Sequence, residues 1–177
     1  MNTEVPEVKV YEAGHKPVIA QYASRIELVE TIDKNITGKM EVNTGTVVLA
    51  MVMDILSGRT PLFRFKETFK NQDIPVLLGE DISLEKLGDH VLGRVLDRIH
   101  EFGPDRIFTE IAVNALQVAE IAETACHFDT TSMRVWGDYD PKEDDPFSLQ
   151  FGFSKNKRPD LKQFVMTLLT VEGGLPT

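Results

Sequence analysis

The chain has 177 residues, of which 42% are hydrophobic and 27% charged, so it is long enough for one sizeable core or two small ones. Its formal net charge of -9 is not the electrostatic footprint of a protein that coats nucleic acid, so any DNA contact must come from a local basic patch. The single cysteine, Cys126, excludes an intrachain disulfide, favours a reducing cytoplasm, and is expected to be buried.

Residues 1–16 are predicted to be an extended or disordered N-terminus. Their acidic sequence lacks the apolar region of a signal peptide. The longest apolar run, at residues 46–56, is too short to span a bilayer, so it predicts a buried helix and no membrane partner.

Residues 17–124 follow a helical period and predict a helical domain. The first helix is predicted from residue 17 to Gly38 as one amphipathic stripe that includes Val18 and Tyr22. A second begins near Asn43 or Thr44 and ends at Ser57 and Gly58, and a short helix is expected at 61–70.

The clearest helical signals lie in residues 81–120. Ser83 is a candidate cap for a short helix that Gly88 closes. Gly103 is a predicted C-cap, and Pro104 falls in the first turn of the helix that follows. Two apolar stripes mark these last two helices, which favours a bundle with a helix-turn-helix as one option: Val91, Leu92, Val95, Leu96, Ile99 and Phe102 in the first, and Ile107, Phe108, Ile111, Ala115, Leu116 and Ala119 in the second.

From residue 125 the pattern changes to three predicted strands, at 125–136, about 147–154 and 163–171. The predicted fold class is therefore α+β. The segment 137–146 is a turn-rich loop with net charge -4, and the segment 155–162 is a loop with net charge +3. Trp136 and Phe147 are expected to be core or interface residues.

Asp129 lies within what the pattern predicts to be a buried strand, with Thr131 on its face and Phe128 and Thr130 on the other. A lone Asp near a strand end is usually a turn former or a hydrogen-bond acceptor. The alternative is a metal ligand, because phosphoryl transfer by two divalent metals needs a carboxylate that bridges them from a rigid position.

Two stretches carry a resemblance: "HFDTTSMRVWGDYD" at 127–140 and "FGFSKNKRPDLKQFVMTLLTVEGGLP" at 151–176. They resemble the DDE transposases of bacterial insertion sequences, in the broad IS-four-like group. In that group a His-x-Asp-Thr-Thr-Ser strand precedes a Gly-[Phe/Tyr]-Ser-Lys-x-x-Arg-Pro-Asp-Leu-Lys-Gln run and a further strand. The helical half, notably "LGDHVLGRVLDRIHEFGPDRIFTEIA", is also similar to the domain that precedes the nuclease core there, so the resemblance spans about 15–177. It implies that the helical domain, residues 17–124, binds DNA or mediates dimerisation.

The resemblance implies that residues 125–177 are the first three strands of an RNase H-like core. Asp129 matches the first catalytic carboxylate and metal ligand, flanked by His127, Thr130 and Ser132. The complete enzyme would use Mg²⁺ or Mn²⁺ to cleave DNA strands and transfer them. The second Asp and the Glu of that triad are absent here. The chain is therefore predicted to be a truncated piece that neither cuts DNA nor holds a metal stably. The acidic residues of the 137–146 loop are expected to be solvated: Asp138, Asp140, Asp144 and Asp145.

The candidate DNA contacts are cations of two segments. In the basic loop these are Lys155, Lys157, Arg158 and Lys162, with an Arg158–Asp160 structural turn as the alternative. On the helix at 89–102, Arg94 and Arg98 are candidates for reading bases, although the exposed face there is mixed in sign.

Three functions stay open. The first is the N-terminal portion of an insertion-sequence transposase. The second is a non-catalytic remnant that binds terminal-repeat DNA, or dimerises with full-length transposase and inhibits it. The third is a decayed gene product without activity. The expected location is the bacterial cytoplasm, at the nucleoid when bound to DNA. An exposed edge on the third strand predicts self-association.

Overall fold

The computed structural model describes residues 8–38, 40–121, 125–137, 139, 149–153, 157–171 and 174–176. The chain divides into two compact units, Met1–Ala119 and Glu120–Thr177, called here the helical unit and the sheet unit. The order of helices followed by an antiparallel sheet confirms the predicted α+β class.

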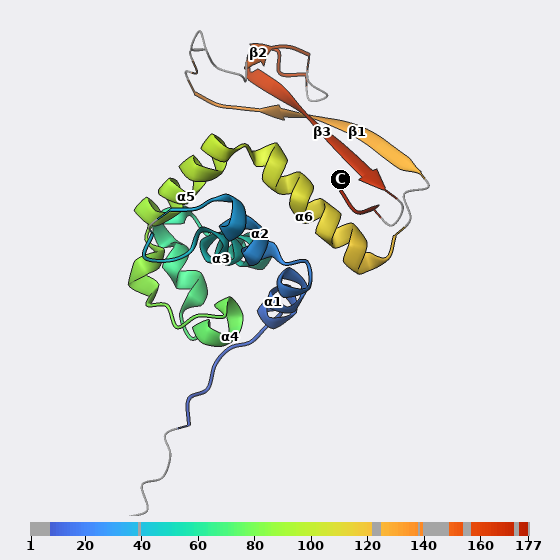
Figure 1. Cartoon of the computed structure of the whole chain (residues 1–177). Helices are drawn as coiled ribbons and strands as arrows, with labels where there is room; N and C mark the ends of the chain where they lie inside the picture. The colour runs from blue at the N-terminus through green and yellow to red at the C-terminus, as the bar shows by residue number, and fades with distance from the viewer. Residues whose placement is uncertain are drawn as a thin grey trace, which may run out of the picture. The chain divides into compact units, whose positions relative to one another are not determined.

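The helical unit is built around α3 (Figure 1). In chain order its elements are α1 (Lys16–Arg25), α2 (Leu28–Asn35), α3 (Thr44–Ser57), the 3-10 helix η1 (Leu62–Phe69), α4 (Ile74–Leu78), the 3-10 helix η2 (Leu84–Leu87), α5 (Asp89–Phe102) and α6 (Pro104–Ala119). α3 contacts α1, α2, α4, α5 and η1, and the core includes Ile32, Val47, Met53, Phe65 and Leu92. The prediction of a buried helix over 46–56 is confirmed for most of its length, because α3 buries Val47, Leu49, Ala50, Met53 and Asp54.

The single helix predicted from residue 17 to Gly38 is wrong, because the chain breaks between α1 and α2 at Glu27. The backbone of Glu27 adopts the left-handed region, with φ of 53°. The N–H of Ile26 donates to the Tyr22 carbonyl and closes α1 before the break. The change of direction also removes Val18 and Tyr22 from the core, and 59% of each residue is exposed. Nothing in the composition at Glu27 signals this break, since neither Gly nor Pro is present.

The predictions around α5 and α6 agree with the structure. The Ser83 hydroxyl accepts a hydrogen bond from the N–H of Glu85 at the start of η2. Val91, Leu92 and Val95 are buried on α5. Gly103 has φ of 109°, a conformation that suits glycine, and Pro104 is the first residue of α6. α6 ends at Ala119, the last residue of the predicted apolar stripe, and residues 122–124, at the end of the predicted helical domain, lie outside the described part of the chain.

The sheet unit contains β1 (Cys126–Arg134), β2 (Gln150–Phe151) and β3 (Lys162–Val171), all antiparallel and in the order β1-β3-β2. The expectation that the third strand forms the edge is wrong. β3 lies in the middle because Lys162 and Gln163 pair with β2, while residues 163–171 pair with β1 (Figure 1). β1, with nine residues, is an edge strand of this sheet.

The expected burial of the strand at 125–136 and of Cys126 is also wrong. All of β1 is exposed except the half-buried Arg134, and Cys126 is exposed. Among the described residues of the sheet unit, Val171 is the one fully buried hydrophobic side chain. The reason is that hydrophobic and β-branched residues predict a strand, but the burial of that strand depends on a second layer packed against it.

Among the described residues, no single helix is long and apolar enough to span a bilayer. α3 and η1 together reach the length and apolar composition of a membrane span, but the pair is bent by 86°.

Candidate functional site

Asp129 is the fourth of nine residues in β1, so it is neither at a strand end nor in a turn. It lies opposite Leu168 of β3. The N–H of Thr130 donates a hydrogen bond to Asp129 Oδ1 over 2.9 Å, so the hydrogen-bond acceptor role is present even though the turn role is not. A position in mid-strand gives the carboxylate a well-defined direction, as a ligand site requires.

The face of the sheet that carries Asp129 follows from the register, because directly opposed residues of an antiparallel pair share a face. It contains His127, Thr131 and Met133 from β1, and Lys162, Phe164, Met166, Leu168 and Thr170 from β3. Asp129 is thus the one carboxylate on this two-stranded face, with apolar side chains on the neighbouring strand.

The residues present do not fit a divalent metal on their own. The described part of the chain holds no group of three or more His, Cys, Asp or Glu side chains placed to bind an ion. Mg²⁺ sites use carboxylate oxygens with ordered waters, and a two-metal site needs several carboxylates. Asp138, Asp140, Asp144 and Asp145 lie outside the described residues. We therefore assign no metal-dependent step to these residues.

In the basic loop, Arg158 forms the structural turn that the sequence left as an alternative. Its Nε and Nη2 donate to the two carboxylate oxygens of Asp160 over 2.7 and 2.6 Å. The Arg158 guanidinium holds the pKa of the Asp160 carboxyl below its usual value. The mutual neutralisation leaves Arg158 less available for a phosphate. Lys157 is exposed, with φ of 53°, and Lys155 lies outside the described residues.

Lys162 fastens the start of β3 to the segment after β1. Its Nζ donates a hydrogen bond to the carbonyl oxygen of Tyr139 and lies 6.0 Å from the centroid of the Phe151 ring. The N–H of Val135 donates to the Lys162 carbonyl over 3.0 Å. Lys162 therefore holds the start of β3 against Val135 and Tyr139, the residues that follow β1.

Arg94 and Arg98 of α5 differ in their surroundings. Arg94 is exposed, and its Nε lies 3.4 Å from the His90 carbonyl of the same helix. Arg98 is half-buried, its guanidinium packs against Gly38, and its Nη1 is buried without a hydrogen-bond partner. The packing favours a structural role for Arg98, whereas Arg94 is free to reach a partner.

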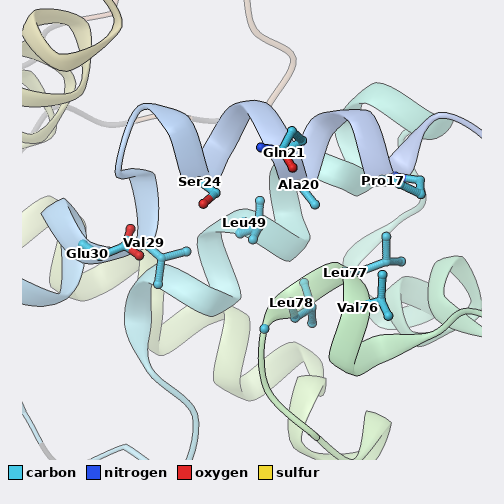
Figure 2. Close-up of a pocket in the computed structure, with 11 residues that line it drawn as sticks. Pro17, Ala20, Gln21, Ser24, Val29, Glu30, Leu49, Val76, Leu77 and Leu78 are labelled. Atoms are coloured by element: carbon cyan, nitrogen blue, oxygen red, sulfur yellow. The ribbon is translucent and has the colours of Figure 1, made fainter. Parts of the chain in front are cut away.

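The helical unit also has an open groove of about 430 Å³ between α1, α2, α3 and α4 (Figure 2). Leu49, Val29 and Leu77 supply apolar surface, and Gln21 and Glu30 supply polar groups. None of the residues that the sequence singled out lines it. With Glu30 as its one ionisable side chain, the groove lacks a pair of groups for acid–base chemistry.

Sequence reasoning did not single out Phe151 and Phe153 as functional residues. Both are exposed phenylalanines beside the basic loop. In the sequence, the alternation of "FSLQFGF" at 147–153 indicates a strand and does not by itself indicate the exposure of these rings.

The family described as a domain of unknown function (DUF4277) matches residues 8–113, more than half of the chain. The chain belongs to this family. The match falls within the helical unit and ends inside α6. Comparison with curated proteins and with solved structures finds no match.

Proposed function

We propose that the chain is the N-terminal part of an insertion-sequence DDE transposase, acting on the DNA ends of its element in the bacterial cytoplasm. The observation that carries the proposal is the relation between the two motifs. The Asp-Thr-Thr-Ser motif lies on β1, and the Arg-Pro-Asp-Leu-Lys-Gln motif leads directly into β3, whose residues 163–171 pair with β1. The two stretches that resemble the transposases thus meet on adjacent strands.

Asp129 supports the same proposal through its position. It lies in mid-strand, opposite Leu168 of β3, and its Oδ1 accepts a hydrogen bond from the Thr130 N–H. In the complete enzyme Asp129 would be one ligand for Mg²⁺ or Mn²⁺, with an Asp and a Glu from further residues. This chain's contribution is to hold that carboxylate on a paired strand.

The test begins with the gene. We expect the reading frame to continue beyond codon 177 and to encode a strand with an Asp and a helix with a Glu. In that longer protein, Asp129→Ala should abolish Mg²⁺-dependent cleavage of a labelled terminal-repeat DNA while DNA affinity stays within about twofold. Asp105→Ala, an exposed carboxylate of the helical unit, is the matched control and should cleave normally. Normal cleavage by the Asp129→Ala protein would sink the proposal.

A second candidate is a non-catalytic chain that binds terminal-repeat DNA or pairs with the full-length transposase and inhibits it. The incomplete donor set around Asp129 favours it among the described residues. A stop at codon 177, together with a salt-sensitive gel shift of terminal-repeat DNA by the chain, would select this candidate over the first. Addition of the chain to full-length enzyme should then lower the cleavage rate.

A further inference from the structure

Two open grooves lie on either side of the exposed edge of α2. The first is the groove of about 430 Å³ shown in Figure 2, which is called here the α1–α4 groove. The second, of about 290 Å³, lies between α2 and α6 and is called the α2–α6 groove. Glu30 lines both of them, so the two grooves are neighbours on one surface of the helical unit.

The α1–α4 groove is mostly apolar. Its lining includes Ala20 of α1, Leu49 of α3 and Val76 of α4, and 66% of Val76 is exposed. In Figure 2, Pro17 and Val76 mark one end of the groove and Glu30 marks the other. A small-molecule site encloses most of its ligand, whereas an open apolar groove fits the side chains of a protein partner.

The exposed edge of α2 is acidic. Glu27, Glu30 and Lys34 follow at i, i+3 and i+7, and all three are exposed. Glu110 of α6 joins them in the α2–α6 groove, where Lys34 is the one cation of the lining. Within the described part of the chain, neither Glu27 nor Glu30 forms an ion pair. Their charges are therefore available to a partner.

The negative charge extends beyond the lining residues. Burial raises the pKa of the Asp33 carboxyl, and repulsion from Glu80 and Glu30 raises it further, so these three carboxylates lie close enough to interact. Residues 16–39, 44–57, 71–85 and 104–119 line or adjoin the grooves, and they contain ten carboxylates against five lysine and arginine residues. The surface is thus negative with its cations counted, and it should repel DNA.

We propose that the two grooves dock a cationic amphipathic helix of a partner protein. Its apolar side chains enter the α1–α4 groove, and its lysine or arginine side chains lie over Glu30 and beside Glu27 and Glu110. Recognition of a helix in a groove uses apolar anchors at i, i+3, i+4 and i+7, and complementary charge fixes the orientation and speeds association. The inference concerns the helical unit and does not depend on the proposed action of the chain on DNA.

The probe is a dye-labelled peptide of about fourteen residues, with leucine at every third or fourth position and lysine between. Fluorescence anisotropy should show saturable binding to the full chain, weakened by added salt. A peptide with glutamate in place of each lysine should bind at least about tenfold more weakly. A peptide with serine in place of each leucine should lose as much, because the apolar anchors are then missing.

The place of binding is checked by the amide shifts of the isotope-labelled chain in two-dimensional NMR. Addition of the lysine–leucine peptide should shift the amide signals of Ala20, Ser24, Glu30 and Val76, which line the α1–α4 groove. The amide signal of Gly93 in α5, outside both linings, should stay in place.

Variants of the chain are compared with the same peptide. Ser24→Trp puts a large ring into the lining of the α1–α4 groove and should weaken binding at least about tenfold. Glu30→Gln should weaken it about two- to fivefold, and Glu30→Lys should weaken it further because like charges then meet. Gln117→Trp and Asp105→Asn change exposed residues outside both linings, and each should bind within about twofold of the wild type.

Far-UV circular dichroism checks that each variant keeps its helices, and Glu30→Lys keeps the test decisive if Ser24→Trp does not fold. The proposal is overturned if the glutamate peptide binds as well as the lysine peptide, or if the shifted amides lie outside the two grooves. Normal binding by both Ser24→Trp and Glu30→Lys would also overturn it. Displacement of the peptide by a blunt DNA duplex would make the surface a nucleic-acid site instead. Loss of self-association in Ser24→Trp, measured by light scattering without peptide, would make it a contact between copies of this chain.

Discussion

Gly45 of α3 lies directly against the backbone of Val29 in α2. A Cβ atom built on Gly45 would be 2.8 Å from Val29 Cα and closer still to the Val29 carbonyl oxygen. Backbone atoms cannot move aside as a side chain can, so this close approach of the two helices depends on the missing Cβ. The same backbone N–H of Gly45 donates to Asp33 Oδ1 over 2.7 Å, which ties α2 to the start of α3.

Gly45→Ala should therefore destabilise the helical unit by about 2 kcal/mol or more, since overpacking in a tight core costs roughly 1–3 kcal/mol. The free energy of unfolding is measured by urea titration with circular dichroism at 222 nm, which follows the helices. Gly93→Ala is the matched control, because Gly93 is inside α5 and a Cβ atom built on it would meet no atom within 4 Å. The control should stabilise by about 0.5–1 kcal/mol. Equal effects of the two substitutions would contradict the packing argument.

The buried carboxylate of Asp54 should stabilise the packing of the segment after α3 against the end of that helix. Asp54 Oδ2 accepts a hydrogen bond from the N–H of Thr60 at 3.0 Å, and Oδ1 accepts one from the Thr68 hydroxyl at 2.5 Å. Asp54→Ala leaves both donors without that acceptor, at a cost of about 3 kcal/mol in unfolding free energy. Thr68→Ser keeps the hydroxyl and should cost much less. A loss below about 0.5 kcal/mol for Asp54→Ala in the urea titration would show that the network contributes little.

The Asp33 carboxyl should weaken the fold as the pH rises. Burial raises the pKa of Asp33, Glu80 and Glu30 raise it further, and the hydrogen bond from Gly45 opposes them. Because the folded pKa lies above the unfolded value, the stability from the neutral acid is present at low pH and is lost as the pH rises through the folded pKa. Asp33→Asn stays neutral and keeps an acceptor for Gly45. The free energy of unfolding of Asp33→Asn relative to the wild type should increase between about pH 3 and pH 7 in paired urea titrations. A decrease would show that the pKa of Asp33 is lowered on folding rather than raised.

Arg158 should control the titration of Asp160. The guanidinium holds the pKa of Asp160 below its ordinary value through two hydrogen bonds. In Arg158→Ala, the Asp160 pKa measured by carboxyl carbon NMR should rise towards the value of a free aspartate. Arg158→Lys should lie between the two, because lysine lacks the planar fork that binds both oxygens. An unchanged pKa in Arg158→Ala would mean that the pair does not persist in solution.

The parts of the fold that the sequence predicts well are those with local signals. The apolar stripe from Val91 to Val95 and the Gly103–Pro104 boundary specify α5 and α6 through interactions within a few residues. α4, with Pro75 near its start and only five residues, is too short to show a period, and neither Gly nor Pro marks the break at Glu27, whose φ is 53°. The sequence thus predicts the helices better than their boundaries.

The site divides in the same way. The strand that carries Asp129 and the Arg158–Asp160 pair follow from neighbouring residues, and both appear in the structure. The exposure of β1 and the central place of β3 depend on contacts between segments far apart in sequence. The predictions of a buried β1 and of a β3 at the sheet edge are therefore wrong. Arg98 illustrates the difference, because only the approach of Gly38 from another part of the chain shows where its guanidinium packs.

The pairing of β1 with β3 also affects how the chain folds. Cys126 pairs with Val171 and Arg134 with Gln163, so every rung of this ladder closes a loop that includes residues 135–161. The helices need mostly short-range contacts, and long-range strand pairing is slower because loop-closure entropy is lost before the contacts form. After dilution from denaturant, the helical signal at 222 nm should therefore recover before the fluorescence of Trp136. In a newly made chain, the sheet unit should be the last part to become resistant to proteolysis.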